Sequence, residues 1–355
     1  MKFSEKLIDW YSVEKRDLPW RNTKNPYFVW LSEIILQQTR VDQGMAYYKR
    51  FITTFSTVNA LATAEEEKVL NLWQGLGYYS RARNLHASAK YIVNELHGKF
   101  PNNYKEILKL KGVGDYTASA IASFCFGEST AVVDGNVYRF LSRYFGVETP
   151  IDTGKGNKEF KSLAQELIKD VDPAIFNQAI MEFGALQCKP KNPSCEDCPF
   201  IDSCFAYAHQ KIDVLPVKKG KVKVSKKYFN YLVIKTPSGR TKIEQRTGKG
   251  IWQNLYQFPL VETDAIVSAE VLEQTDAFQK IFLNTTFELL RFNEKPLVHK
   301  LSHQHLNTTF WIIEVQQESL SNINWSQIED YPLPILISKA VEEIDAAKIF
   351  SNFVS

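Results

Sequence analysis

The spacing of hydrophobic residues divides the chain into two parts. From the N-terminus to about residue 207, apolar residues recur every three or four positions, as in Leu7, Trp10 and Tyr11, which is the spacing of amphipathic helices. Glycines and prolines interrupt this pattern often. This part is therefore predicted to be a set of helices joined by turns.

After residue 227 the pattern changes to alternation. Residues 228–236 alternate and are rich in β-branched and aromatic residues, which predicts a strand. A turn at residues 237–239 follows, and residues 241–246 are expected to form a partner strand. The other predicted elements are strands at 287–292 and 308–315 and helices at 268–278 and 336–349. The C-terminal part is thus expected to be a smaller α+β domain.

The junction between the two parts is basic. Six lysines fall within residues 218–227, mixed with glycine, valine and serine. A solvated linker is the simpler interpretation, and a basic arm that touches nucleic-acid phosphates is the alternative. The expected organisation is a helical domain at 1–207, a basic linker at 208–227 and an α+β domain at 228–355.

Composition narrows the class of protein. The chain has 355 residues, 44% of them hydrophobic, which is enough for two cores, and it has no long apolar run. Its charged N-terminus does not read as a signal peptide. The net charge is only +3, so a nucleic-acid footprint would have to be local. Four of the five cysteines are clustered, which argues against a secreted disulfide scaffold and indicates the reducing cytoplasm.

A glycine motif separates two predicted helical segments in the middle of the helical part. Residues 110–115 read LKGVGD and are followed by a predicted helix at 116–126. Gly112 and Gly114 let backbone N–H groups approach a ligand, and the next helix adds its positive end, so the hairpin can bind a phosphate.

Asp134 follows this helix, after three apolar residues. A carboxylate beside a phosphate-binding hairpin suggests chemistry on a nucleic-acid backbone. The structural alternative is an ordinary helix connection with Asp134 as the N-cap of a helix at 137–144. These residues alone favour neither interpretation.

Four cysteines form a ligand-like set within residues 188–204. Cys188, Cys195, Cys198 and Cys204 have the spacing C-x6-C-x2-C-x5-C. Four thiolates suit zinc or a 4Fe–4S cluster. Zinc modules usually present paired C-x2-C units, so the asymmetric spacing favours the iron–sulfur cluster. Cys125 lies on an apolar helix and is expected to be a small buried hydrophobe.

One glutamate interrupts an apolar helix. Residues 29–39 read VWLSEIILQQT, with Glu33 at the centre. Burial would raise the pKa of Glu33 and suit it to act as a general acid near neutral pH. Gln37 and Gln38, one turn later, could reach base edges. A glutamate that emerges at a helix surface is the simpler alternative.

A second unusual segment combines glycines, aromatic residues and arginines. Residues 72–84 read LWQGLGYYSRARN. Such a segment can wedge into a duplex and stack on a base, while Arg81 and Arg83 hold phosphates. The structural alternative is a helix connection with a packed tyrosine pair.

Taken together, these stretches resemble the adenine DNA glycosylase (MutY) family of the helix–hairpin–helix, iron–sulfur superfamily. The match runs from about residue 18 to residue 204 and is specific because several motifs occur in order. They are residues 18–21, 30–39, 75–84, 110–114, 134–136 and 176–184 and the four cysteines.

The resemblance implies a fold, a reaction and partners. The fold is a mainly α helix–hairpin–helix glycosylase domain with a 4Fe–4S loop, followed by an α+β Nudix-like domain that recognises 8-oxoguanine. The reaction is excision of adenine mispaired with 8-oxoguanine or guanine in double-stranded DNA. Nothing indicates a membrane or an obligate oligomer, so a monomer is expected.

The resemblance also assigns residues to roles. Glu33 matches the catalytic acid and Asp134 the second carboxylate, while Asn136 and Tyr116 match residues beside them. The residues matched to the adenine pocket are Trp20, Arg21, Leu36 and Glu182. Those matched to positions within or beside the opened duplex are Gln38, Thr39, Leu76 and Tyr78, with Tyr78 at the 8-oxoguanine step.

In the C-terminal domain, residues 299–303 read HKLSH and resemble the family's Phe-Ser-His loop, so Ser302 and His303 are expected to contact the lesion. Leu301 replaces the family's phenylalanine. Residues 261–274 lack the acidic arrangement of a Nudix hydrolase, which disfavours a pyrophosphohydrolase.

Two other functions are compatible with parts of this sequence. A bifunctional pyrimidine glycosylase/lyase needs a lysine where this chain has Tyr116 and would lack a glutamate matching Glu33. Incidental lyase activity from another lysine stays open. A non-catalytic lesion-binding protein would not need both Glu33 and Asp134. The sequence therefore favours a monofunctional glycosylase.

Overall fold

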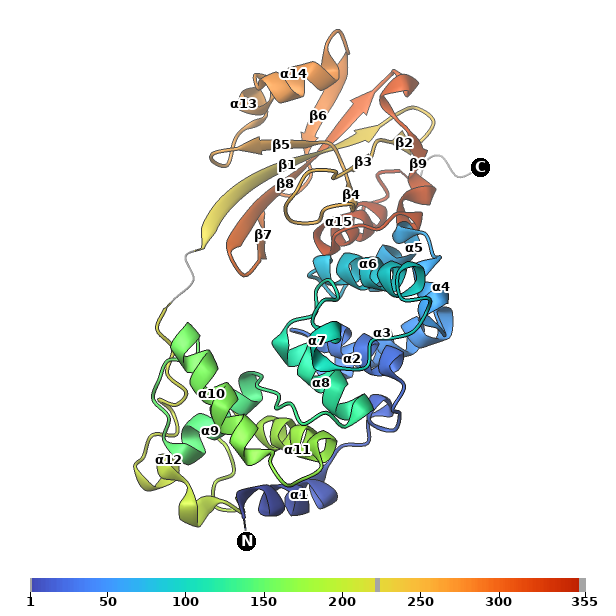
Figure 1. Cartoon of the computed structure of the whole chain (residues 1–355). Coiled ribbons are helices and arrows are strands. Elements are labelled where there is room, and N and C mark those ends of the chain that lie inside the picture. The colour runs from blue at the N-terminus through green and yellow to red at the C-terminus, as the bar shows by residue number, and fades with distance from the viewer. Residues whose placement is uncertain (1, 221–223, 351–355) are drawn as a thin grey trace. The chain divides into compact units, whose positions relative to one another are not determined.

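The computed structural model describes residues 2–220 and 224–350 (Figure 1). Its contacts divide the chain into two units. Unit 1 comprises Met1–Ala64 and Asn84–Gly220, and unit 2 comprises Glu65–Arg83 and Lys221–Ser355. A segment from within the predicted helical domain thus groups with the C-terminal part. Residues 221–223, inside the predicted basic linker, lie outside the described residues.

Unit 1 is helical, as the three- and four-residue periodicity predicts. Its α-helices are α1 (Phe3–Glu14), α2 (Pro26–Leu36), α3 (Val41–Thr54), α4 (Val58–Ala62), α7 (Tyr104–Ile107), α8 (Asp115–Phe126), α9 (Gly135–Phe145), α10 (Gly154–Leu167), α11 (Pro173–Leu186) and α12 (Phe205–Ala208), with short 3-10 turns η1 (Pro19–Arg21) and η2 (Ile201–Ser203). Helix α6 (Ser80–Asn94) contributes residues to both units. The helices predicted at 116–126 and 137–144 are confirmed as α8 and α9.

The core of unit 1 forms where α9 and α11 pack together. On α9, Val137, Phe140 and Leu141 share one buried face. The Phe140 ring lies against Phe183 of α11, with centroids 4.2 Å apart. Both helices have side-chain N-caps, Asp134 for α9 and Asp172 for α11, which fix where each helix begins.

Unit 2 contains an α+β fold, as predicted. One sheet has the strand order β5 (Leu260–Thr263), β1 (Ser225–Lys235), β8 (Gln304–Val315) and β6 (Phe287–Arg291), and β7 (Leu297–Lys300) also pairs with β8. Strands β1 and β8 run parallel along their whole paired length, and the other pairs are antiparallel. Helices α13 (Ala269–Glu273) and α14 (Asp276–Phe282) pack on the sheet through Leu272, Phe278 and Phe282.

The smaller elements of unit 2 complete it. They are helix α5 (Glu66–Trp73), helix α15 (Ile335–Ala346), 3-10 turns η3 (Glu318–Leu320) and η4 (Trp325–Asp330), and two small sheets, β2 (Arg240–Thr241) with β9 (Ile323–Asn324) and β3 (Glu244–Gln245) with β4 (Tyr256–Gln257).

Two expectations for this part were wrong in detail. The strand predicted at 241–246 does not pair with β1, because β5 and β8 occupy both of its edges. That segment divides instead between β2 and β3, which pair elsewhere. The single helix predicted at 268–278 is two helices, because the Thr275 side chain caps a new helix by accepting from the Phe278 N–H.

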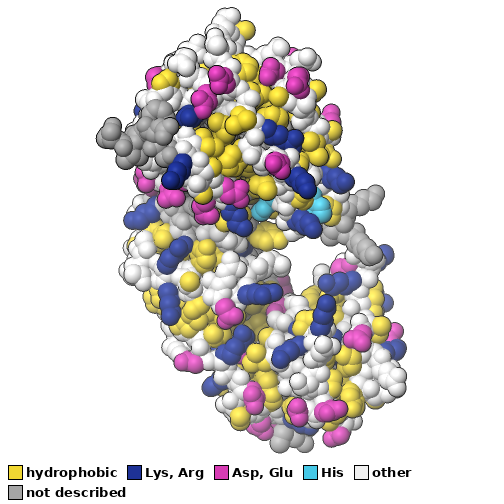
Figure 2. All heavy atoms as spheres, turned by 180° about the vertical axis from the view of Figure 1, so that it is seen from behind, with side chains coloured by type: hydrophobic (Ala, Val, Ile, Leu, Met, Phe, Trp, Pro, Cys, Tyr) yellow, Lys and Arg dark blue, Asp and Glu magenta, His cyan; other side chains and the backbone are white. Residues whose placement is uncertain are grey.

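The surface and the helices agree with the charge and hydropathy of the sequence. Figure 2 shows Lys and Arg side chains interspersed with Asp and Glu over the face drawn, in keeping with the small net charge. None of the helices in residues 2–220 and 224–350 is both long and apolar enough to cross a bilayer.

Candidate active site

One cavity of about 880 Å³ in unit 1 brings the predicted catalytic residues together. Its walls come from η1, α2, the start of α8, the loop before α9, and α11. The predicted residues that line it are Trp20, Arg21, Glu33, Leu36, Gln37, Gln38, Thr39, Tyr116, Asp134, Asn136 and Glu182. Residues as far apart in sequence as Trp20 and Glu182 therefore meet in a space large enough to admit a base.

Glu33 lies on α2, a helix in which most residues are buried, and only 8% of Glu33 is exposed. The pKa of its carboxyl group is raised to about 7, mainly by burial. A hydrogen bond from Tyr116 lowers this pKa, and the nearby charge of Asp134 raises it further. The expectation of a raised pKa is confirmed. Glu33 can therefore hold a proton near neutral pH and release it.

Asp134 is the N-cap of α9 and also lines the cavity, so the N-cap interpretation is confirmed, and a part in chemistry stays a prediction. Its Oδ1 accepts the backbone N–H groups of Asn136 at 2.9 Å and Val137 at 2.8 Å, and its Oδ2 accepts the Asn136 side-chain amide at 2.8 Å. Burial raises the pKa of Asp134, while these hydrogen bonds oppose the rise. The carboxylate is thereby fixed in one orientation.

Tyr116 lies on the first turn of α8, close enough to the carboxyl groups of Glu33 and Asp134 to interact with both. Its hydroxyl lies 3.3 Å from the Met181 sulfur and interacts with Glu33. Burial, followed by the charges of Glu33 and Asp134, raises the pKa of Tyr116 well above its ordinary value. The Tyr116 hydroxyl therefore keeps its proton at neutral pH and can donate a hydrogen bond.

Glu182 is the second buried glutamate of the cavity, and its partners are cations. Its Oε2 lies 2.7 Å from Arg16 and 2.7 Å from Arg21, and its Oε1 accepts from both as well. Burial alone would raise the pKa of Glu182, but the hydrogen bonds from the two arginines lower it to about 2. Arg16 was not identified from the sequence, and the one available signal was that a buried carboxylate needs a cation.

Arg139 was also not identified, although it supports the site. It donates to the Asn136 side-chain oxygen at 2.8 Å, to the Gly184 carbonyl at 2.6 Å and to the Cys188 carbonyl at 2.7 Å. Helix α11 passes so close to this point that a Cβ on Gly184 would lie 2.6 Å from the Asn136 carbonyl oxygen. A continuous set of contacts therefore joins Asp134 to the cysteine loop.

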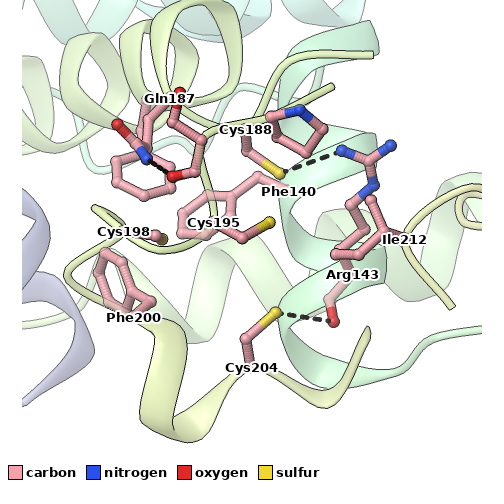
Figure 3. Close-up of a pocket in the computed structure, with 12 residues that line it drawn as sticks. Phe140, Arg143, Gln187, Cys188, Cys195, Cys198, Phe200, Cys204 and Ile212 are labelled. Atoms are coloured by element: carbon pink, nitrogen blue, oxygen red, sulfur yellow. Dashed lines mark hydrogen bonds between the residues drawn. The ribbon is translucent and has the colours of Figure 1, made fainter. Parts of the chain in front are cut away.

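The four clustered cysteines line one small cavity, and Figure 3 shows their side chains around a common space. The buried Arg143 donates to the Cys188 sulfur at 3.5 Å and to the Lys189 carbonyl at 2.8 Å. Within the described residues, no three metal-ligating side chains converge tightly enough for a single ion. Four thiols around one cavity beside the buried Arg143 are a donor set that a 4Fe–4S cluster takes, so the residues present fit such a group.

Cys125 is half-buried on α8, less enclosed than expected. Burial raises the pKa of its thiol to about 12, so it stays protonated.

The hairpin glycines differ in backbone conformation. Gly112 has φ +78°, and a Cβ there would lie 2.7 Å from the Asn84 Cβ, so this position requires glycine. Gly114 is the N-cap of α8 with an extended backbone, and its Cβ position is open. The glycine hairpin thus leads directly into the N-terminus of α8, at the place where the sequence predicts that a helix begins.

Unit 2 brings together two residues predicted to contact the lesion. The turn before α6 has positive φ at Gly75, Gly77 and Tyr78, and Tyr78 as a residue is 53% exposed. The Tyr78 hydroxyl lies 2.7 Å from the Ser302 hydroxyl, which belongs to the β7–β8 loop. Tyr79, in contrast, is buried and donates to the Leu333 carbonyl.

The other predicted DNA contacts in unit 2 have varied surroundings. His303 is exposed and Leu76 is buried. Arg81 is buried, with its guanidinium against the Gly77 carbonyl at 3.2 Å and over the Trp73 ring. Arg83 donates to the Gln253 carbonyl at 2.7 Å. In this structure the two arginines support the turn, and their contact with phosphates stays a prediction.

Comparisons with known proteins agree with this arrangement. Residues 31–170 match the HhH-GPD superfamily base excision DNA repair protein family, and residues 230–343 match the NUDIX domain. The adenine DNA glycosylase of Buchnera aphidicola subsp. Baizongia pistaciae is 34% identical over 96% of this chain and 96% of its own length. This chain belongs to the adenine DNA glycosylase family.

Other relatives extend the comparison. The human adenine DNA glycosylase is 43% identical over 58% of this chain and 39% of its own length. A solved thermostable thymine-DNA glycosylase has a TM-score of 0.55 and 30% identity, covering 58% of this chain and 95% of its own. An endonuclease III–DNA covalent intermediate, at a TM-score of 0.52 and 21% identity over 58% of this chain and 94% of its own, shares the fold.

Three predictions are thereby confirmed. The family is that of the adenine DNA glycosylases, the fold is a helical glycosylase domain with a strand-rich Nudix-like domain, and the protein is a DNA glycosylase enzyme of base excision repair. As a DNA glycosylase, the protein hydrolyses N-glycosidic bonds.

Proposed function

We propose that this glycosylase removes adenine mispaired with 8-oxoguanine or guanine in duplex DNA, by hydrolysis and without strand cleavage. The observation that carries the proposal is the pairing of Glu33, with a pKa of about 7, and the oriented carboxylate of Asp134 in one cavity. An acid that is protonated near neutral pH beside a fixed carboxylate is the arrangement that glycosidic bond hydrolysis needs.

The first step is protonation of the base. Adenine within a duplex is out of reach, so the nucleotide is flipped into the cavity at a cost of a few kcal/mol. Glu33 donates its proton to N7 of adenine, the bond between C1′ and N9 breaks, and its electron pair leaves with the base.

The second step is capture of the sugar by water. Loss of adenine leaves an oxocarbenium-like sugar, which the Asp134 carboxylate stabilises or attacks. Tyr116 and Asn136 hold Asp134 and the water in place. Water adds to C1′, and where Asp134 has bonded to C1′ that bond breaks and its electron pair returns to the carboxylate. One proton of the water goes to the Glu33 carboxylate, which restores the acid.

The absence of a strand-cleaving step is supported by the cavity wall. A lyase needs an amine to form a Schiff base with the sugar. Tyr116 stands at the position expected for such a lysine, and no lysine is among the described residues that line the cavity.

The adenine pocket is supported by the remaining wall residues. Trp20 is buried, with its ring against Tyr48 at 5.2 Å, and with Leu36 it offers an apolar surface to a purine. Arg21 and Glu182 supply the polar edge of the same wall.

Lesion recognition is assigned to the turn of unit 2. The exposed Tyr78 ring, tied to Ser302, is available to enter the duplex at the 8-oxoguanine step. Gln37, Gln38 and Thr39 line the cavity in unit 1. Gln38 is assigned, with Tyr78, to the space that the flipped adenine leaves, Thr39 to a place beside the lesion, and Gln37 to a base edge. The hairpin from Gly112 to Gly114 is assigned to the DNA phosphate.

A 4Fe–4S cluster would be held by Cys188, Cys195, Cys198 and Cys204. When bound, the cluster would order the loop that carries it, and Lys189 and Lys191, next to Cys188 in this loop, would offer positive charge to DNA. Hydrolysis of the N-glycosidic bond needs no electron transfer, so the roles above fall to protein side chains. Free thiols in such a set agree with a reducing compartment such as the cytoplasm.

The test uses duplex DNA with adenine opposite 8-oxoguanine, incubated with protein and then treated with or without alkali. Strand breaks that require alkali are expected, since the enzyme leaves an intact abasic strand. Breaks without alkali would indicate a lyase, and no breaks would indicate a binding protein. The Glu33→Gln variant should lower excision by about 10²- to 10⁴-fold while it still binds the duplex. Normal release of adenine by that variant would show that the acid lies elsewhere.

A further inference from the structure

The segment that leads into Asp134 has an unusual environment. Residues 129–133 form neither helix nor strand, and Ala131 and Val132 are completely buried among the helices of unit 1. No strand of the described residues pairs with this segment. Its backbone N–H and C=O groups must nevertheless have hydrogen-bond partners, because unpaired buried groups are costly.

Side chains of two helices supply these partners in alternation. From α10, Gln165 accepts the Ala131 N–H at 3.0 Å and donates to the Ser129 carbonyl at 2.8 Å. From α11, Asn177 accepts the Val132 N–H at 3.0 Å and donates to the Thr130 carbonyl at 2.8 Å.

Odd-numbered residues thus bond to α10 and even-numbered ones to α11, as in a strand between two neighbours. The amide of Asn177 is completely buried, and its second donor bond goes to the Ser123 hydroxyl at 2.9 Å.

Lys161 of α10 adds a link to the hairpin. Its ammonium group donates to the Ala131 carbonyl at 2.7 Å, to Asp115 at 2.9 Å and to the Ser119 hydroxyl at 2.9 Å. Asp115 directly follows Gly114 and also accepts from the Tyr104 hydroxyl at 2.6 Å. One cation therefore ties the first turns of α8 to the segment that ends at Asp134.

We propose that Asn177, Gln165 and Lys161 act together as positioning residues that set the place of the Asp134 carboxylate in the cavity. None of the three is a cavity-lining residue, so they act through the backbone of residues 129–133. The inference rests on the proposed role of Asp134 in excision. A displacement of a reacting group by about 1 Å can lower a rate by about a hundredfold, so a small shift of this segment is enough to matter.

The experiment compares Lys161→Met, Gln165→Leu and Asn177→Asp with the parent and with Lys158→Met. Lys158 is an exposed residue of the same helix and serves as the matched control. Three quantities are measured: the single-turnover rate of adenine excision, the affinity for a duplex whose 2′-fluorinated adenosine resists excision, and the affinity for a duplex with a cationic pyrrolidine in place of the sugar.

The three positioning variants should lose about tenfold to a hundredfold in rate. Their affinity for the fluorinated duplex should stay at the parent value. Their affinity for the cationic duplex should fall in parallel with the rate, because that ligand senses the carboxylate as the transition state does. Lys158→Met should match the parent in all three measurements.

Two results would overturn the proposal: rates equal to the Lys158→Met control, or equal losses of affinity for both duplexes, which a general loss of structure would give. If Asn177→Asp fails to fold, the two α10 variants decide the question alone. An Asp134→Asn variant with normal excision would refute the proposed function itself. Loss of excision in Asp134→Asn, with unchanged positioning variants, would refute this inference alone.

Discussion

Two regions of the same cavity each hold a buried glutamate, and they shift its pKa in opposite directions. Around Glu33 the wall is apolar helix α2, with a tyrosine hydroxyl and a second carboxylate nearby, and the pKa is about 7. Around Glu182 two guanidinium groups form four hydrogen bonds with the carboxylate, and the pKa is about 2.

The contrast shows that burial by itself does not decide what a carboxyl group can do. Burial raises the pKa of both glutamates, and only the presence of paired cations reverses the outcome. Glu33 can therefore exchange a proton, while Glu182 stays charged and holds Arg16 and Arg21 in the wall.

The largest expected effect is on the rate of excision against pH. If protonated Glu33 is the acid, the single-turnover rate should be level below pH 7 and fall about tenfold for each pH unit above it. Rates measured from pH 5 to 9, with duplex affinity followed in the same buffers, would show this. A level profile up to pH 9 would break the comparison, because it would remove the proton from Glu33.

The next effect is on stability, and its sign differs between the two glutamates. The folded pKa of Glu33 lies above its unfolded value, so its contribution is complete below pH 4.5 and is lost as pH rises through 7. The folded pKa of Glu182 lies below its unfolded value, so its contribution is present above pH 4.5 and is lost as pH falls towards 2.

Each change amounts to about 3 to 4 kcal/mol, because each pKa lies about 2.5 from the ordinary value of 4.5 and one pKa unit corresponds to about 1.4 kcal/mol. The measurement is the free energy of unfolding in urea for the parent, Glu33→Gln and Glu182→Gln across the two pH ranges. A common pH window for both variants would mean that the two carboxyl groups share one environment.

The smallest expected effect is a difference in stability between variants of the two arginines that pair with Glu182. The Arg21 side chain is 13% exposed and that of Arg16 is 36% exposed. Arg21→Met should therefore cost about 2 kcal/mol of stability and Arg16→Met about 1 kcal/mol. Thermal or urea unfolding of the two variants gives the order, and a larger loss for Arg16→Met would show that burial does not set the strength of these pairs.

The part of the site that depends on local pattern could be predicted from sequence. A single glutamate in an apolar helix predicts burial and a raised pKa, and both are confirmed for Glu33. The helix boundaries at Gly114 and Asp134 could also be predicted, because capping is a local interaction.

The partners of these residues could not be predicted, since they depend on packing between distant segments. Arg16 meets Glu182 across 166 positions, and no local pattern marks that pair. Arg139 looks like an ordinary helical arginine until α11 is placed beside it. The prediction that residues 241–246 pair with β1 was wrong for the same reason, because the neighbours of a strand depend on how the whole sheet packs.

The parallel pairing of β1 with β8 has a consequence for how the chain matures. Strand β1 enters the sheet beside a partner that follows it by about 80 positions, with Ser225 opposite Gln304 and Lys235 opposite Glu314. A ribosome releases β1 well before β8 exists, and its buried positions Tyr231 to Ile234 are then without their sheet. Such slowly completed pairings expose apolar edges. Interruption of synthesis between the two strands should leave a product prone to aggregate.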